Sequence, residues 1–310
     1  MPDIVISEFM DAAAIEDLSA DYDVLYDPAL VDRPEDLASS LTEARALIVR
    51  NRTQVRGPLL EAAPALRVVG RLGVGLDNID LGACRDRNIE VCPATGANNV
   101  SVAEYVITAI AALLRGAYFA REAMLAGTWP RSALMGGELQ GRQLGLLGFG
   151  AIARETADRA LALGMTVVAH DPFVDPADPA WGRVQSLEKD ALIERSDAIS
   201  LHVPLNDATR HMIDAAALSA MKPEAVLVNA ARGGVVDESA LAEALKSGRI
   251  AGAALDVFET EPLTAEAAQK FRDIGNLILT PHIAGVTVES NVRVSAVTAE
   301  NVRRVLERTP

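Results

Sequence analysis

The chain alternates short apolar runs with polar stretches of helical spacing over most of its length. In the first third the apolar runs are continuous, which is typical of strands that a parallel sheet buries on both faces. They occupy residues 3–7, 23–26, 46–49, 67–69 and 89–92. Stretches with helical spacing at 34–44 and 56–65 have Pro or Gly at their edges. This alternation predicts a doubly wound α/β domain.

A second series of strands and helices follows residue 140. Its six apolar runs lie at 143–150, 166–171, 197–203, 225–230, 250–258 and 276–282. Six strands with intervening helices match the count of a dinucleotide-binding sheet. With 310 residues the chain is long enough for about two domains. The sequence therefore predicts two doubly wound parallel-sheet domains.

Between the two series, residues 101–127 have the pattern of one long helix. Ser101 and Glu104 have the spacing of a capping box at its start, and Gly127 would end it. The helix is apolar over so much of its surface that we expect it to be buried between domains or subunits. Residues 171–181, rich in Pro and Asp, predict a surface turn, and an amphipathic helix follows residue 286.

Composition excludes several classes of protein. A formal net charge of −14 argues against nucleic acid as a partner, because binding to phosphates needs a basic face. The apolar run at 105–114 is too short to span a bilayer, and the N-terminus has no basic segment typical of a secretory signal. Cys84 and Cys92 have neither redox-pair nor zinc-site spacing, so we expect reduced thiols, no metal and a cytoplasmic protein.

A glycine-rich turn predicts the cofactor. Gly148, Gly150 and Ala153 form a G-x-G-x-x-A pattern directly after an apolar run and before a stretch of helical spacing. Gly148 permits the tight turn, and Gly150 lets the backbone approach a pyrophosphate at the helix N-terminus. The next strand ends in Asp171, where a carboxylate can bind the ribose hydroxyls and repel a 2′-phosphate. The pattern predicts NAD rather than NADP.

Three polar residues follow the ends of different predicted strands: Arg232, Glu261 and His282. Singly, such residues are more often a surface ion pair (Arg), a solvated turn residue (Glu before Pro) or a satisfied polar group (His) than part of a catalytic site. The carboxyl ends of parallel strands meet at one edge, however, so the three should lie together beside the cofactor. Hydride transfer to a carbonyl needs a proton donor, which a histidine beside a carboxylate can supply near neutral pH. A guanidinium can hold a carboxylate and the carbonyl beside it.

Ordered motifs along nearly the whole chain resemble the D-isomer-specific 2-hydroxyacid dehydrogenase family. They include LGLLGFGAIA, SLHVPLNDATRHMI, AVLVNAARGGVVDESALAEAL, AGAALDVFETEP, TPHIAG and VGRLGVGLDNID. Within that family the chain is most similar to D-3-phosphoglycerate dehydrogenases without their regulatory domain. The resemblance implies a Rossmann-type NAD-binding domain at 99–285, inserted into a flavodoxin-like substrate-binding domain formed by 1–98 plus 286–310. It also implies a homodimer built on the cofactor domains.

The resemblance further implies roles for individual residues. His282 would carry the proton, Glu261 would stabilise its imidazolium, and Arg232 would orient the substrate carboxylate. The cofactor would be bound by Gly148, Gly150, Ala151, Ile152, Asp171, His202, Val203, Pro204, Thr209, Ala230, Ala231, Asp256 and Gly285. The substrate would be bound by Arg50, Asn51, Arg52, Arg71, Gly73, Val74 and Gly75.

The substrate loop departs from the family pattern. Where the family usually has Arg-Ser-x-Thr, this chain has Arg50-Asn51-Arg52-Thr53. Three guanidinium groups, with Arg71 as the third, predict a second anion on the substrate, as in 3-phosphoglycerate. The alternatives are structural ion pairs for these arginines, sulfolactate as substrate, and reduction of hydroxypyruvate or glyoxylate. A non-catalytic NAD-sensing protein is a further alternative, and Glu261 disfavours a formate-type enzyme, which would have Gln there.

Overall fold

The computed structural model describes residues 1–175 and 177–308. Residue 176 of the predicted surface turn and residues 309–310 of the predicted C-terminal segment lie outside the described residues. The chain divides into two compact units, Met1–Asn98 with Val286–Pro310 and Asn99–Gly285. Each unit contains one parallel sheet, and we describe them separately as the N-terminal unit and the central unit.

The N-terminal unit begins with strand β1 and ends with the long helix α11. Its strands are β1 Ile4–Ile6, β2 Val24–Tyr26, β3 Ala46–Val49, β4 Val68–Arg71 and β5 Glu90–Pro93. Its helices are α1 Ala12–Ser19, η1 Leu30–Asp32, α2 Pro34–Ser40, α3 Pro58–Glu61, α4 Leu81–Asp86 and α11 Val288–Glu307. All five predicted strands are confirmed, as is the amphipathic helix after residue 286.

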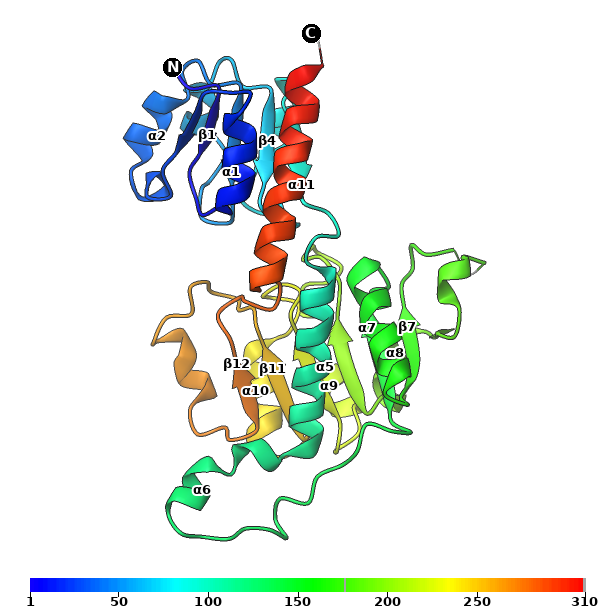
Figure 1. Cartoon of the computed structure of the whole chain (residues 1–310). Helices are drawn as coiled ribbons and strands as arrows, with labels where there is room; N and C mark the ends of the chain where they lie inside the picture. The colour runs from blue at the N-terminus through cyan, green and yellow to red at the C-terminus, as the bar shows by residue number, and fades with distance from the viewer. Residues whose placement is uncertain (176, 309–310) are drawn as a thin grey trace. The chain divides into compact units, whose positions relative to one another are not determined.

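The strand order of the N-terminal unit is β2-β1-β3-β4-β5, with every pair parallel. This is the flavodoxin-like order, in which the direction of chain progression reverses between β1 and β3. Helices cover both faces, and Figure 1 shows α1 and α11 side by side on one of them. Ile4 and Ile6 of β1 are buried toward that face and Val5 toward the other, as the two-residue repeat of a strand requires.

The central unit contains the second predicted sheet. Its strands are β6 Gln143–Leu147, β7 Thr166–His170, β8 Gln185–Ser186, β9 Ala198–Leu201, β10 Val226–Asn229, β11 Gly252–Leu255 and β12 Leu277–Leu279. Its α-helices are α5 Asn99–Arg115, α6 Arg121–Leu125, α7 Ala151–Ala162, α8 Lys189–Arg195, α9 Ala215–Ala220 and α10 Glu238–Lys246. Its short 3-10 helices are η2 Ala117–Phe119, η3 Pro179–Trp181 and η4 Ala267–Phe271.

The strand order of the central unit is β12-β11-β10-β9-β6-β7-β8, which is the Rossmann order with one further strand beyond the sixth. The structure therefore confirms two doubly wound parallel sheets. The prediction of six strands was one short, because β8 has only two residues, both exposed, and lacks an apolar signal. No helix in the described ranges is long and apolar enough to cross a membrane.

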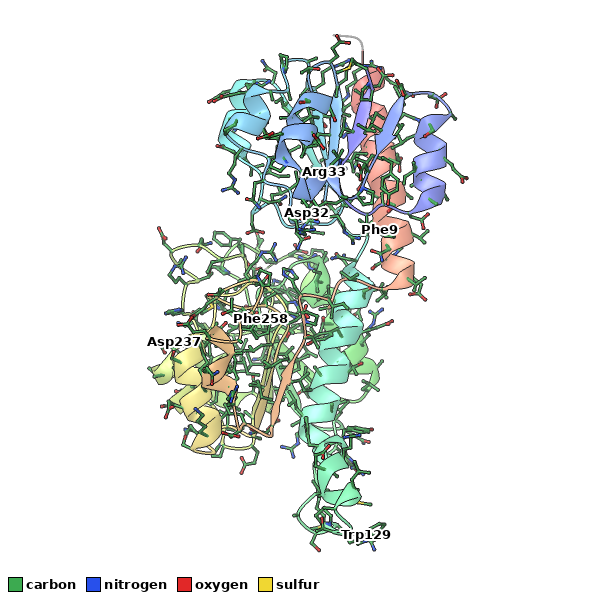
Figure 2. The ribbon with its side chains drawn as sticks, turned by 90° about the vertical axis from the view of Figure 1, so that its left-hand side faces the viewer. Phe9, Asp32, Arg33, Trp129, Asp237 and Phe258 are labelled. Atoms are coloured by element: carbon green, nitrogen blue, oxygen red, sulfur yellow. The ribbon has the colours of Figure 1, made fainter. Side chains whose placement is uncertain are left out.

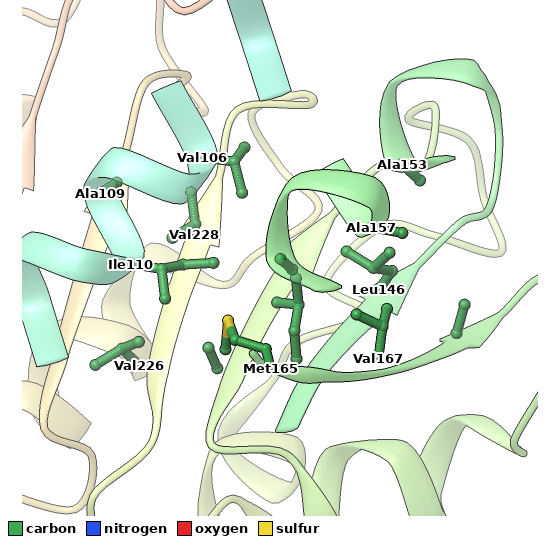
Figure 3. Close-up of a cluster of buried hydrophobic side chains, with 14 of the residues drawn as sticks. Val106, Ala109, Ile110, Leu146, Ala153, Ala157, Met165, Val167, Val226 and Val228 are labelled. Atoms are coloured by element: carbon green, nitrogen blue, oxygen red, sulfur yellow. The ribbon is translucent and has the colours of Figure 1, made fainter. Parts of the chain in front are cut away.

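The core on one face of the central sheet is formed by α5, α7 and the strands beneath them. Figure 3 shows Val106 and Ile110 of α5 beside Val226 and Val228 of β10, with Ala157 of α7 in the same cluster. Residues from α8, α9 and α10 form a second cluster with the sheet. The alternation of strands and helices thus produces the two-faced core that its apolar pattern predicts.

The predicted helix at 101–127 was wrong in extent. Helix α5 starts earlier, at Asn99, so Ser101 lies buried inside it and does not cap it. It ends at Arg115 because Gly116 adopts φ 66°, a left-handed conformation that ends helices. Its buried face packs on α7, β10 and β11 of its own unit. A capping box is formed instead by Thr287 and Ser290, at the start of α11.

The predicted surface turn at 171–181 contains a buried anchor. Trp181 in η3 is 8% exposed, and its ring stacks on Phe149 with 4.6 Å between centroids. Phe149 lies between the two glycines of the predicted cofactor turn. The segment after β7 is therefore fixed to the glycine turn by aromatic packing. The prediction of a surface turn rested on the Asp and Pro content of the segment and did not anticipate this contact.

Candidate active site

The central sheet brings the predicted cofactor and catalytic residues to one edge. All its strands are parallel, so the segments that follow them lie beyond the same edge. The glycine turn follows β6, Asp171 follows β7, and residues 202–204 follow β9. Arg232 follows β10, Glu261 and Asp256 follow β11, and His282 follows β12. Neighbouring strands thus contribute neighbouring functional groups.

The glycine turn has the geometry that a bound pyrophosphate requires. Gly148 adopts φ 90°, and a Cβ there would lie 2.4 Å from the carbonyl oxygen of His202. Around Gly150, a Cβ would meet nothing within 4 Å, so space is open beside the turn. Helix α7 begins at Ala151, and none of the described side chains caps its first turn. Its free N–H groups and the helix dipole therefore favour an anion here.

Asp171 closes the turn from the neighbouring strand. Its Oδ2 accepts a hydrogen bond from the Phe149 N–H at 2.8 Å, and its Oδ1 accepts one from the Phe173 N–H at 2.9 Å. Each carboxylate oxygen retains acceptor capacity for ribose hydroxyls.

The segment after β9 carries two further predicted cofactor residues, His202 and Thr209. Burial lowers the pKa of His202 to about 4, so this ring is neutral near pH 7. Thr209 is buried and donates to the Pro204 carbonyl at 2.6 Å, which shapes the loop after β9.

His282 and Glu261 form a direct pair, with 2.8 Å between Nδ1 and Oε2. The other carboxylate oxygen of Glu261 accepts the Phe258 N–H at 3.0 Å. Partial burial raises the pKa of Glu261, but the hydrogen bonds from His282 and Phe258 outweigh it, and the net pKa is lowered. Glu261 is therefore ionised near neutral pH and only accepts, so the His282 ring presents a proton on Nδ1.

A buried carboxylate holds the loop that carries His282. Asp256 is 1% exposed and accepts the N–H groups of Ile283 and Ala284, each at 2.8 Å. The Thr280 hydroxyl donates to it at 2.6 Å, and the Tyr105 hydroxyl lies 2.6 Å from that of Thr280. These bonds hold His282 at φ 52°, a left-handed conformation that is uncommon for non-glycine residues.

Asp256 is one of the predicted cofactor-binding residues, and its place in the family motif implies a contact with the nicotinamide carboxamide. Three of the roughly four acceptor positions of its carboxylate are occupied by the loop of His282. One position is left for a carboxamide N–H, so both functions are compatible.

The segment that carries Arg232 is held by Asn229, at the end of β10. The Asn229 side chain, which is 1% exposed, donates to the Arg232 carbonyl at 3.0 Å and accepts the Ala231 N–H at 3.1 Å. Gly233 lies against the loop of Glu261, because a Cβ at this position would lie 1.8 Å from the Phe258 carbonyl oxygen. The Arg232 and Glu261 loops are therefore in direct backbone contact.

The N-terminal unit contains the predicted substrate residues, and a second buried carboxylate organises their loop. Glu8, two residues after the end of β1, accepts the backbone N–H groups of Arg50, Arg52 and Thr53 after β3. The Arg50 guanidinium lies 5.6 Å from the centre of the Phe9 ring and donates to Asn291 at 2.9 Å. Burial lowers the pKa of Arg50, although Glu8 opposes that effect.

The other two predicted arginines have local partners. Arg52 is exposed and forms an ion pair with Asp32 of η1, and this hydrogen bond raises the pKa of Arg52. Arg71, at the end of β4, donates from Nε to the Gly75 carbonyl at 2.8 Å, so it braces the predicted Gly73–Gly75 loop. Val74 at the tip of that loop is 36% exposed.

A family model for the NAD-binding domain of D-isomer specific 2-hydroxyacid dehydrogenases matches residues 107–284. The chain belongs to this family. As a D-2-hydroxyacid dehydrogenase, it is an NAD-dependent oxidoreductase that interconverts a 2-hydroxy acid and its 2-oxo acid by hydride transfer. The matched range lies within the central unit, and the glycine turn described above is the part of that unit suited to the cofactor.

Relatives of this dehydrogenase differ in the acid they use. The chain is 58% identical to the (S)-sulfolactate dehydrogenase of Chromohalobacter salexigens over 99% of each protein. It is 38% identical to the D-3-phosphoglycerate dehydrogenase of Archaeoglobus fulgidus over 89% of this chain and 52% of that protein. Its structure resembles that of D-lactate dehydrogenase from Aquifex aeolicus complexed with NAD and lactic acid, with a TM-score of 0.84 at 28% identity, over 98% of this chain and 94% of that one.

Sequence reasoning missed the buried groups that hold the loops of this dehydrogenase. Asn229, at the end of β10, was not named, although its position in the pattern could have identified it. Asp256, directly after β11, was predicted to bind the cofactor, but its hydrogen bonds to the His282 loop were not foreseen. Glu8 also lies just beyond the end of a strand, but its partners are 42 to 45 residues away. Contacts over such distances have no local sequence signal.

Proposed function

We propose that His282 is the proton carrier of this dehydrogenase, that Glu261 stabilises its charged form, and that Arg232 orients the substrate carboxylate. The observation that supports this assignment is the 2.8 Å contact between His282 Nδ1 and the Glu261 carboxylate at the edge of the cofactor sheet. Because Nδ1 is committed to Glu261, the second ring nitrogen is the one available to a substrate.

In the oxidation direction, neutral His282 accepts the proton of the substrate hydroxyl at Nε2. NAD held at the glycine turn would supply the hydride acceptor for C2, so that the alcohol becomes a carbonyl. Glu261 then offsets the positive charge on the imidazolium. In the reduction direction His282 returns the proton to the forming alkoxide, while Arg232 polarises the carbonyl and holds the neighbouring carboxylate.

We propose that Met1–Asn98 with residues 286–308 binds the substrate. In a flavodoxin-like sheet, ligands bind beyond the carboxyl ends of the strands where the strand order reverses. Here that point lies between β1 and β3, and the loop of Arg50, Asn51 and Arg52 follows β3. Two guanidinium groups on one loop favour an acid with a second anion at its far end.

We propose that this second anion is a sulfonate, so that the substrate pair is sulfolactate and sulfopyruvate. The 58% identity to a sulfolactate dehydrogenase supports this choice over phosphate. The (S) descriptor is compatible with a D-specific family. Sulfur takes precedence over the carboxyl group in naming, so an acid with the spatial arrangement of D-lactate becomes (S) when its methyl group carries a sulfonate.

The test is NADH oxidation with 2-oxo acids that share a head group and differ in their tail. The panel is sulfopyruvate, phosphohydroxypyruvate, oxaloacetate, hydroxypyruvate, glyoxylate and pyruvate. The proposal predicts the highest kcat/KM for sulfopyruvate. A preference for hydroxypyruvate or glyoxylate would refute the anionic tail. NADH binding without turnover of any acid in the panel would favour an NAD-sensing protein.

We also infer that the protein is cytoplasmic. We further infer that it forms a homodimer through the central unit. The supporting feature is the arm, residues 116–137, which carries large exposed side chains: Tyr118 at 76%, Leu125 at 69%, Trp129 at 76% and Met135 at 82%. Figures 1 and 2 show α6 and Trp129 extending away from the sheet of their own unit. Apolar surface of this kind marks a protein interface. A monomer in sedimentation velocity at micromolar concentration would refute this inference.

A further inference from the structure

The loop that carries Glu261 is attached to α10 by a buried carboxylate. Glu238, in the first turn of α10, is only 3% exposed. Its Oε1 accepts the backbone N–H of Glu259 at 2.7 Å, and its Oε2 accepts the Lys270 ammonium at 2.9 Å. Figure 2 marks Asp237, which caps α10, and Phe258, at the start of the loop. Both oxygens of a buried ion are therefore bonded, as burial of charge demands.

A second set of contacts returns from the loop to the helix. The Glu259 carboxylate accepts the Glu238 backbone N–H at 3.4 Å and lies 3.0 Å from His211 Nε2. Its other oxygen lies 3.8 Å from the Lys270 ammonium. We call these four residues, Glu238, Glu259, Lys270 and His211, the Glu238 clasp. Glu238 of α10, Lys270 of η4 and His211 of the segment after β9 all contact Glu259 in the loop.

The Glu238 clasp ends next to the peptide that aligns Glu261. The Glu259 N–H is bonded to Glu238, and the N–H of Phe258, one residue earlier, is bonded to Glu261. The opposite carboxylate oxygen of Glu261 meets His282. On its other side the loop backbone is pressed against Gly233, where no side chain would fit. If the Glu259 N–H lost its bond to Glu238, the loop backbone would therefore shift. The neighbouring Phe258 N–H would then change direction, and with it the Glu261 carboxylate that accepts it.

We propose that Glu238, with Lys270 as its counter-ion, is a positioning residue that aims Glu261 at His282. This inference rests on the proposed function, because it gives Glu238 an effect on the reaction only through those two residues. Glu238 touches no reacting atom. Its contribution is to hold the Glu261 loop in one conformation before substrate arrives, and small misplacements of such groups are costly in rate.

The chain offers a matched control at the opposite edge of the same sheet. Asp197, just before β9, accepts the Gln143 N–H at 2.8 Å and the Lys222 ammonium at 2.9 Å. It is therefore another largely buried carboxylate with one backbone and one lysine partner, and Arg142 adds an ion pair at 3.5 Å. It lies, however, at the amino ends of the strands. Asp197→Asn should reproduce the loss of stability without the effect on the reaction.

The experiment measures kcat, KM, NADH dissociation constant and Tm for Glu238→Ala, Glu238→Gln and Asp197→Asn, with sulfopyruvate as the 2-oxo acid. For Glu238→Ala we expect kcat to fall by roughly 10- to 100-fold. KM and NADH binding should change by less than about twofold, because neither substrate nor cofactor contacts this residue. Glu238→Gln keeps an acceptor for the Glu259 N–H, so it should restore part of the rate. Asp197→Asn should keep kcat near that of wild type.

A double variant separates positioning from general loss of structure. If Glu238 acts only through Glu261, Glu238→Ala should lower kcat no further in a Glu261→Gln background. An equal loss in both backgrounds, or a loss no greater than that of Asp197→Asn, would overturn the inference. If Glu238→Ala does not fold, Glu238→Gln and Lys270→Met carry the same comparison. A Glu261→Gln protein with unchanged kcat would instead refute the proposed function, and this inference with it.

Discussion

The two edges that carry the predicted site residues are built differently. At the edge of the central sheet, the segments of Arg232, Glu261 and His282 are each held by a buried polar group. At the edge of the N-terminal sheet, Glu8 fixes the backbone of the substrate loop in the same way, but the exposed Arg52 side chain pairs with an exposed carboxylate, that of Asp32. Chemistry common to a family needs fixed geometry, whereas the choice of acid can be changed by surface charge. The comparison predicts that rate depends on the first edge and selectivity on the second.

The largest expected effect is at His282. His282→Ala should lower kcat by about 10²–10⁴-fold, because it removes the proton carrier. The NADH dissociation constant, measured by fluorescence titration, should be nearly unchanged. His211, with φ 50° and a carboxylate partner at 3.0 Å, belongs to the Glu238 clasp, so His211→Ala should lower kcat no more than the roughly 10- to 100-fold expected for Glu238→Ala. Loss of NADH binding in His282→Ala would show that His282 has a structural role. The edge of the central sheet would then not be assigned to the reaction rate.

At the other edge, Arg52→Ala should act on KM. We expect KM for sulfopyruvate to rise roughly tenfold or more through loss of a charged hydrogen bond, while kcat and the kinetics with hydroxypyruvate stay nearly the same. Arg33 is a neighbouring exposed arginine that pairs with Asp27 and Asp36, so Arg33→Ala is the matched control (Figure 2). Equal KM values in the two variants would assign Arg52 to a structural ion pair.

The smallest expected effect is at Asp32, the present partner of Arg52. A sulfonate that binds Arg52 must compete with this carboxylate. Asp32→Asn should therefore lower KM for sulfopyruvate by about two- to fivefold, as expected for an exposed ion pair. In an Arg52→Ala background the same change should have no effect. A KM that rises in Asp32→Asn would mean that Asp32 orients Arg52 for the substrate and does not compete with it.

Much of the fold could be predicted from the sequence, because continuous apolar runs and a glycine turn are local signals. The two sheets, their parallel strands and NAD as cofactor followed from them. The break at Gly116 was missed because a glycine within a stretch of helical spacing does not indicate its own φ. Strand β8 was missed because Gln185 and Ser186 are polar and exposed.

The site was predictable to the extent that strand ends converge. That rule brought Arg232, Glu261 and His282 to one edge, and their catalytic roles stay a prediction. The groups that hold them were not predictable. Glu238 meets Glu259 21 residues away and Lys270 32 residues away, and such pairings become visible only when the chain is folded.

The most direct test of the division between the two edges is the ratio of kcat/KM for sulfopyruvate to that for hydroxypyruvate, in wild type, His282→Ala and Arg52→Ala. We expect a high ratio in wild type. In His282→Ala both values should fall by the same factor and the ratio should persist, whereas in Arg52→Ala the ratio should collapse with turnover of hydroxypyruvate intact. A ratio unchanged in Arg52→Ala, or rates unchanged in His282→Ala, would contradict this division.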